Sequence, residues 1–182
     1  MRIIQNNFLA FVIVLTSLIM IEGIGYMNFT YGNLLFLPVG AEIFVYLLFG
    51  FRVLPGVMIA NTIVGYFLWN SWFGNDLNGF IGHVIIGSLS PLLALYIMKI
   101  FNLSNFIDSK LIEYKHILFS IILTALISTL GKFMFFWGII KEPIEPLSFI
   151  SSYMVGDILG GAVFIYFAIK ILHPLLLRFK LT

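Results

Sequence analysis

The chain has 182 residues, of which 61% are hydrophobic and only 10% are charged, and its formal net charge is +2. This composition excludes an ordinary soluble domain and predicts an all-α, polytopic integral membrane bundle. The small net charge gives no reason to expect a nucleic-acid partner, and the absence of cysteine excludes disulfides and thiolate metal sites.

Apolar runs predict six transmembrane helices in a single domain. They cover about residues 8–26, 33–50, 53–70, 79–100, 116–138 and 150–172. About 20 apolar residues cross the ~30 Å hydrocarbon core of a bilayer. The first run has no convincing small-residue cleavage site, so we expect a retained span rather than a signal peptide.

The connections between the runs differ in length and polarity. Arg52 lies in a very tight link between the second and third runs, and Trp69 and Trp72 flank a polar loop, as expected at a membrane interface. Residues 101–115 form the longest polar connection, with room for a short interfacial helix. Prolines within 141–146 cannot continue a helix.

Basic residues predict the orientation of the bundle. With the N-terminus in the cytoplasm, Lys141 faces outward and the other lysines and arginines, apart from Lys132 within a span, face the cytoplasm. The cytoplasmic group is Arg2, Arg52, Lys99, Lys110, Lys115, Lys170, Arg178 and Lys180. We therefore expect both termini on the cytoplasmic side.

Apart from Lys99, His116 and Lys170 at the cytoplasmic ends of the predicted spans, five ionisable residues fall within these spans, namely Glu22, Glu42, His83, Lys132 and Asp157. At about 1.5 Å per residue, four of them lie roughly 6 to 10 Å below the outer surface and Glu42 lies about 14 Å below it. A charge at the centre of a membrane helix costs roughly 2.5 to 3.5 kcal/mol, so it needs a partner, water or a proton. Because five helices contribute to one half of the membrane, we expect an outward-facing polar pocket.

Polar residues recur at helical spacing beside these charges. The three polar stripes are Ser120, Thr124, Ser128 and Lys132; His83, Gly87 and Ser90; and Tyr153 and Asp157. We expect these faces to line the bundle interior, with Ser128 and Tyr153 in the pocket. Asn61 in the third span is expected to hydrogen-bond a neighbouring helix.

Glycines around Asp157 predict close packing of the last span. Gly156 and Gly160 share one face, while Asp157 and Gly161 share the adjacent face. Small residues let a neighbouring backbone approach closely. We therefore expect the last span to be central and packed on several others.

A structural role is the alternative for the charged residues. Lys132 and Asp157 can pair to lock two helices, and burial can hold Glu22 or Glu42 in the neutral form. His83 is close enough to the surface for an interfacial role without a ligand.

Four short patches resemble, in their order along the chain, the MASE-type membrane-associated sensor domains of bacteria. The patches are Leu-Pro-Val-Gly at 37–40 with 50–52 and Leu-Pro-Gly at 54–56; residues 82–87; residues 124–131; and residues 153–161. His83 stands where asparagine is commoner in that family, and Tyr153 stands at an aromatic position of its closing segment. The resemblance implies a sensor in the bacterial cytoplasmic (inner) membrane.

Domains of this family usually precede a histidine kinase or a cyclic-dinucleotide enzyme. This chain ends ten residues after its last predicted span, so we expect any output to need a separate membrane or cytoplasmic protein. The leading hypothesis is a stand-alone sensor-like or small-ligand-binding module, with Glu42, Lys132 and Asp157 as its main pocket residues. Two carboxylates and one ammonium suit a zwitterionic or cationic small solute.

Two other function classes stay open. A six-helix protein of this size also resembles the substrate-capturing subunits of energy-coupling-factor uptake systems, although the first span lacks a small-residue stripe, since Val14 follows Ala10. A structural subunit of a larger membrane complex is the third class. An enzyme is disfavoured, and no cofactor is expected, because hydrolase, metal-ligand and phosphate-binding motifs are missing from the sequence.

Overall fold

The computed structural model describes residues 2–23, 32–69, 76–103, 114–137 and 145–178. Helices make up most of these residues, and no strand occurs within them, so the predicted all-α class is confirmed. Glycine and proline mark several of the helix boundaries.

Four helices are long and apolar enough to cross a membrane. They are α1 (Arg2–Gly23), α4 (Leu77–Ile100), α6 (Tyr114–Phe136) and α7 (Pro146–Phe167). A π-helical segment, η3 (Ala168–Leu172), continues α7 into the short α8 (His173–Arg178). These four correspond to the first, fourth, fifth and sixth predicted spans, and α1 begins earlier than expected.

The second predicted span is shorter than expected, whereas the third agrees closely with its predicted range. They are α2 (Pro38–Phe49) and an apolar helix made of η1 (Phe51–Val53), α3 (Leu54–Val64) and η2 (Gly65–Trp69). The 12 residues of α2 are too few to cross a bilayer, since they extend only about 18 Å.

The prediction of a helix from residue 33 was wrong, because residues 32–37 are not helical. Pro38 occupies the first turn of α2, where its missing N–H costs nothing, whereas inside a helix it would break a hydrogen bond. Gly50 ends the helix with a φ of 76°, a left-handed conformation that favours glycine. Predictions that fall on Trp72, on most of the 101–115 connection and on residues 141–144 lie outside the described residues.

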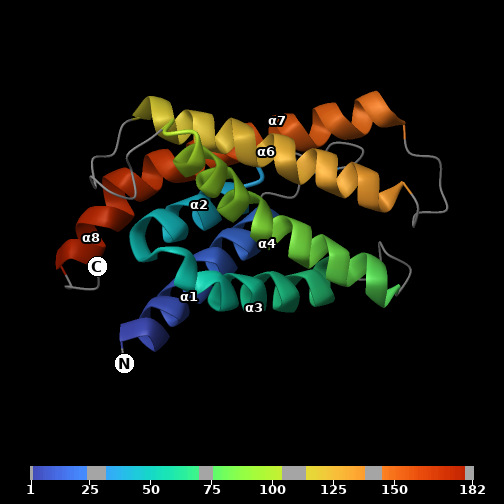
Figure 1. The fold of residues 1–182 in the computed structure, drawn as a ribbon. Helices are drawn as coiled ribbons and strands as arrows, with labels where there is room; N and C mark the ends of the chain where they lie inside the picture. The colour runs from blue at the N-terminus through green and yellow to red at the C-terminus, as the bar shows by residue number, and fades with distance from the viewer. Residues whose placement is uncertain (1, 24–31, 70–75, 104–113, 138–144, 179–182) are drawn as a thin grey trace.

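The helices are arranged around α2 (Figure 1). Around the periphery, α1 packs on α3, α3 on α4, α4 on α6 and α6 on α7, while α2 contacts α1, α4, α6 and α7. Every residue from Pro38 to Tyr46 is buried. The expectation that the last span is central was therefore wrong: α7 packs chiefly on α6 and α2, and α2 takes the central place.

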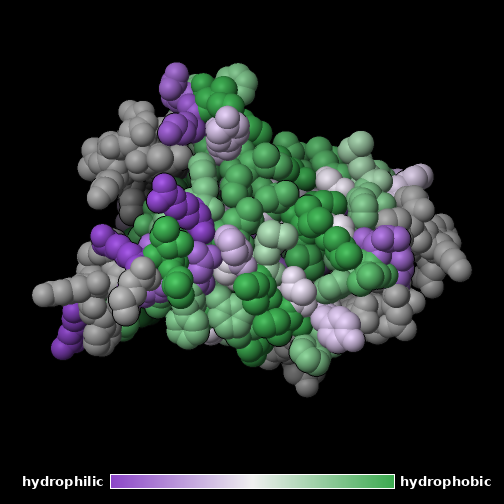
Figure 2. Space-filling model, turned by 60° about the horizontal axis from the view of Figure 1, so that its bottom comes forward, coloured by the Kyte–Doolittle hydropathy of each residue, from purple (hydrophilic) through white to green (hydrophobic). Residues whose placement is uncertain are grey.

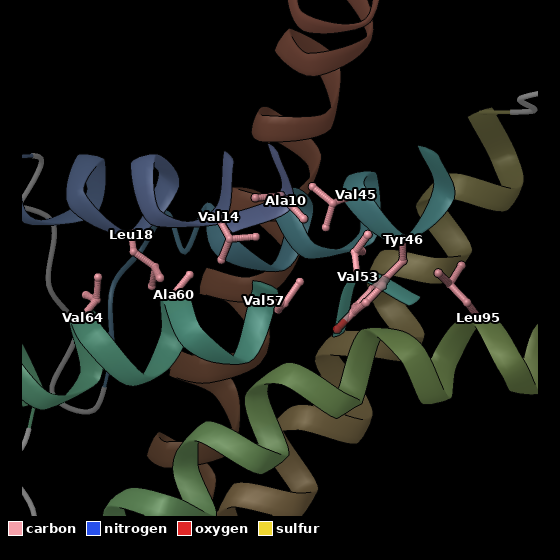
Figure 3. Close-up of a cluster of buried hydrophobic side chains, with 11 residues drawn as sticks. Ala10, Val14, Leu18, Val45, Tyr46, Val53, Val57, Ala60, Val64 and Leu95 are labelled. Carbon is pink, nitrogen blue, oxygen red and sulfur yellow. The ribbon is translucent and has the colours of Figure 1, made fainter. Parts of the chain in front are cut away.

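Small and branched side chains join α1 to α3 (Figure 3). Val14 and Leu18 of α1 face Ala60 and Val64 of α3 in one buried cluster. At the start of α3, the Gly56 N–H donates a 2.9 Å hydrogen bond to Asn7 Oδ1. The same asparagine donates through Nδ2 to the Arg52 carbonyl at 3.1 Å, so it fixes the turn between α2 and α3 against α1.

Hydrophobic residues cover most of the visible surface in Figure 2, and hydrophilic residues gather mainly toward one end. Large side chains such as Phe67, Met134 and Leu147 are exposed. The start of α1 and the final helix α8 lie at the same end of the molecule (Figure 1). The apolar surface and four long helices are compatible with a membrane protein.

Candidate functional site

Asn61 lies at the centre of a hydrogen-bonded junction between three helices, and Glu42 is one of its two partners. Asn61 Nδ2 of α3 donates to Glu42 Oε1 at 2.7 Å and to Ser88 Oγ of α4 at 2.8 Å. One turn after Glu42, the Tyr46 hydroxyl donates to the Ser88 carbonyl at 2.9 Å. The predicted bond from Asn61 to a neighbouring helix is confirmed, and it fixes the position of the Glu42 side chain.

A small polar cavity lies beside this junction. Its polar wall residues are Glu42, Asn61, His83, Thr124, Ser128 and Lys132, contributed by α2, α3, α4 and α6. Its volume of about 20 Å³ is enough for one water molecule. The structure therefore brings together four residues proposed from the sequence as ligand-binding, namely Glu42, His83, Ser128 and Lys132; their ligand-binding role stays a prediction.

The polar stripe of α6 forms one wall of the cavity. Thr124, Ser128 and Lys132 line it at four-residue spacing, as expected of one helix face. Ser120, the first residue of the stripe, is buried outside the cavity wall, and its hydroxyl donates to the Ile117 carbonyl at 2.7 Å. The buried Thr124 Oγ1 has no hydrogen-bond partner among the described residues, which leaves one polar group of the wall available to a ligand.

Lys132 is 2% exposed, and its ammonium lies against two aromatic rings. The Nζ atom is 5.4 Å from the Phe36 ring centroid and 5.0 Å from that of Tyr153. Both distances are within the range of a cation–π interaction. Phe36 comes from the non-helical segment before α2, and Tyr153 comes from α7, so two separate elements hold this ammonium.

Asp157 and Lys132 form no ion pair in the described part of the chain, although the ammonium attracts the carboxylates of both Asp157 and Glu42. Asp157 is 2% exposed, and its Oδ2 atom has no hydrogen-bond partner among the described residues. The alternative in which Lys132 and Asp157 lock two helices by direct pairing is therefore wrong for this conformation. The aromatic rings, rather than the aspartate, contact the ammonium.

The remaining predicted site residues lie at or beyond the cavity wall. Tyr153 and Asp157 are not part of the wall, and Tyr153 reaches it through its contact with Lys132. His83 is part of the wall, and its ring stacks on Phe136 with centroids 6.0 Å apart. Glu22 lies near the end of α1, and its side chain is outside the described residues.

The non-helical segment 32–37 is held on the glycine face of α7. A Cβ atom added to Gly156 would overlap the Asn33 carbonyl, and one added to Gly160 would overlap the Phe36 backbone. The Phe36 N–H donates a 3.0 Å hydrogen bond to the Gly156 carbonyl. The predicted close approach of a backbone to Gly156 and Gly160 is confirmed, and it places the Phe36 ring over Lys132.

Two contributors to the site could not be recognised in the sequence. Phe36 resembles any other aromatic residue of an apolar run, and Ser88 lies outside the predicted stripe of its helix. In that stripe His83 and Gly87 line the cavity, whereas Ser90 donates to the Ile86 carbonyl of its own helix at 2.5 Å.

The arrangement offers hydrogen-bond donors, hydrogen-bond acceptors and charged groups. Among the described residues, no three His, Asp or Glu side chains gather in a way that could hold a metal ion. Comparisons with protein-family models, curated proteins and solved structures gave no match. The resemblance to MASE-type domains therefore rests on the four sequence patches alone.

Proposed function

We propose that this chain is an integral protein of the bacterial cytoplasmic membrane that binds a small polar ligand as a sensor-like module. The four long apolar helices and the exposed apolar side chains support insertion in a bilayer. The position of the first and last helices at one end supports a topology with both termini in the cytoplasm. In that orientation the cavity lies in the outer half, since His83 is near the start of α4 and Lys132 near the end of α6.

The proposal that the protein binds a ligand rests on one observation. Lys132 and Asp157 are both almost fully buried, yet they are not paired with each other. Burying an ammonium and a carboxylate without an ionic partner is costly in an apolar bundle. A zwitterionic ligand offsets this cost by bonding to both groups, and a cationic ligand offsets it at the carboxylate, so the site favours a small zwitterionic or cationic solute.

The size of the cavity adds a condition to this proposal. A volume of about 20 Å³ admits water but no larger solute, so ligand entry requires the wall to move. Phe36 and Val39 form part of that wall, where the non-helical residues 32–37 lead into α2. Movement there changes the start of α2, whose other end leads into the turn at Arg52, on the proposed cytoplasmic side where a partner protein would detect it.

Thermal unfolding of the detergent-purified protein tests the proposal. The panel contains amino acids, polyamines, sugars and salts, each measured on the wild type and on Asp157→Asn. A ligand at about one hundred times its dissociation constant stabilises the protein by about 2.7 kcal/mol. We expect at least one stabilising ligand, whose effect is lost in Asp157→Asn and kept in the control Lys115→Met, which changes an exposed lysine outside the cavity.

Two results would contradict a sensor-like module. If no ligand in the panel stabilises the wild type, the buried charges serve packing, and a structural subunit explains the chain better. If a ligand binds and its uptake into cells increases only when energising partner proteins are present, the chain captures substrate for a transporter.

A further inference from the structure

We infer that the place occupied by the Lys132 ammonium is a binding site for alkylammonium groups, and that the ligand of this protein carries a primary amine. This inference rests on the proposed function, because it names the chemical class of the ligand that enters the same site. The Lys132 side chain is itself an alkylammonium, so the structure contains a bound example of the group.

The first argument is the aromatic pair, Phe36 and Tyr153. The rings lie 5.4 and 5.0 Å from Nζ, and they come from different elements of the fold. The negative face of an aromatic ring attracts a cation, and the attraction is strongest when the site excludes water. Because Lys132 is 2% exposed, water competes little for the ammonium here.

The second argument is the balance of charge around the aromatic pair. Asp157 follows Tyr153 by one helical turn, and its Oδ2 atom accepts no hydrogen bond from the described residues. Asn61 holds Glu42 on the other side of the cavity. The site therefore has two carboxyl groups and one ammonium. One carboxyl group is left without a counter-ion, which suits a second cationic group rather than an anion.

The third argument is that Lys132 can leave the aromatic pair. Its four-carbon stem is flexible, and its side chain lines the polar cavity next to Glu42 and Ser128. Movement of the ammonium toward Glu42 keeps it beside a carboxylate and frees the space between Phe36 and Tyr153. A ligand ammonium then enters this space with Asp157 as its counter-ion.

Chemical rescue of a shortened lysine tests this inference. Lys132→Ala removes the atoms of one n-propylammonium group, so the probe is n-propylammonium chloride, and 1-propanol is its uncharged control of nearly equal shape. We expect n-propylammonium to raise the melting temperature of Lys132→Ala saturably, by about 2 to 4 °C, and 1-propanol to have no such effect. The rise should disappear in the double variant Lys132→Ala with Asp157→Asn.

A second variant covers the case in which Lys132→Ala does not fold. Lys132→Met keeps an unbranched stem that ends at the ε position and lacks the terminal ammonium, so the ammonium ion itself is the probe. Ammonium chloride should stabilise Lys132→Met more than equal concentrations of sodium chloride. Equal effects of the two salts, or of n-propylammonium and 1-propanol on Lys132→Ala, would overturn the inference.

The results separate this inference from the proposed function. A wild-type ligand without an amino group, such as a sugar, would overturn the amine class and leave the binding module in place. Rescue of the lysine variants without any ligand for the wild type would support the ammonium site and contradict the binding module.

Discussion

Asn61 Nδ2 donates a 2.7 Å hydrogen bond to Glu42 Oε1, and this bond joins the short central helix α2 to α3. The second amide hydrogen reaches Ser88 Oγ of α4, so one side chain connects three helices beside the polar cavity. An asparagine in this position supplies the hydrogen-bond donor that a buried carboxyl group needs.

Asn61→Leu should lower the free energy of unfolding by about 1 to 3 kcal/mol, because Glu42 and Ser88 both lose their donor. The measurement is denaturant unfolding of the purified protein. Thr62→Val is the matched control, since the neighbouring Thr62 is exposed and bonds only to the Met58 carbonyl of its own helix. An equal loss of stability in the two variants would show that the junction contributes nothing specific.

The contact of residues 32–37 with α7 predicts that an added side chain at Gly160 lowers the stability of the protein. Gly160→Ala should destabilise the protein by about 1 to 3 kcal/mol, because the added methyl group overlaps the Phe36 backbone. Gly32→Ala is the control, since a Cβ at Gly32 has no neighbour within 4 Å. Thermal unfolding compares them, and a Gly160→Ala protein as stable as Gly32→Ala would contradict the close packing described here.

Valine variants of two buried threonines of α6 distinguish an effect on ligand binding from an effect on packing. Thr124 and Thr129 are both fully buried with an unpartnered hydroxyl among the described residues, but only Thr124 lines the cavity. Replacing either by valine should leave stability unchanged or raise it by up to about 1 kcal/mol, because an unsatisfied buried hydroxyl is removed. Thr124→Val should in addition weaken binding of the panel ligand about tenfold, a loss of one charge-assisted hydrogen bond.

Calorimetric titration of both threonine variants measures this difference. Thr129→Val should bind the ligand as the wild type does. If the two variants bind equally well, the Thr124 hydroxyl has no part in ligand recognition.

The proposed topology predicts which end of α4 faces outward. Because the chain has no cysteine, a single Asn78→Cys or Leu103→Cys carries the only reactive thiol of its protein. In intact cells a membrane-impermeant maleimide should label Asn78→Cys, at the start of α4, and should label Leu103→Cys only after the membrane is permeabilised. The reverse pattern would place both termini outside and move the cavity to the cytoplasmic half.

Much of the site could be predicted because intramembrane charge is rarely exposed to lipid. The cost of burying Glu42, His83 and Lys132 requires them to face other helices, and the helical spacing of Thr124 and Ser128 identifies the same face. This reasoning brings residues of separate spans together without knowing how the helices pack.

The length of α2 could not be predicted in this way. The run from Asn33 to Leu37 is as apolar as a helix, and Pro38 is compatible both with a helix start and with a kink. Its non-helical conformation depends on Gly156 and Gly160, more than one hundred residues away in the sequence. The roles of Phe36 and of Asn7 are equally non-local, since each depends on a contact with a distant backbone.

The complete burial of Pro38–Tyr46 also constrains biogenesis. A 12-residue segment offers the insertion machinery too few apolar residues to be recognised as an independent span. In the proposed membrane location, its stability therefore comes from the helices that enclose it, three of which are synthesised after it. The cavity, whose wall includes residues of α4 and α6, is complete only once these later helices have packed on α2.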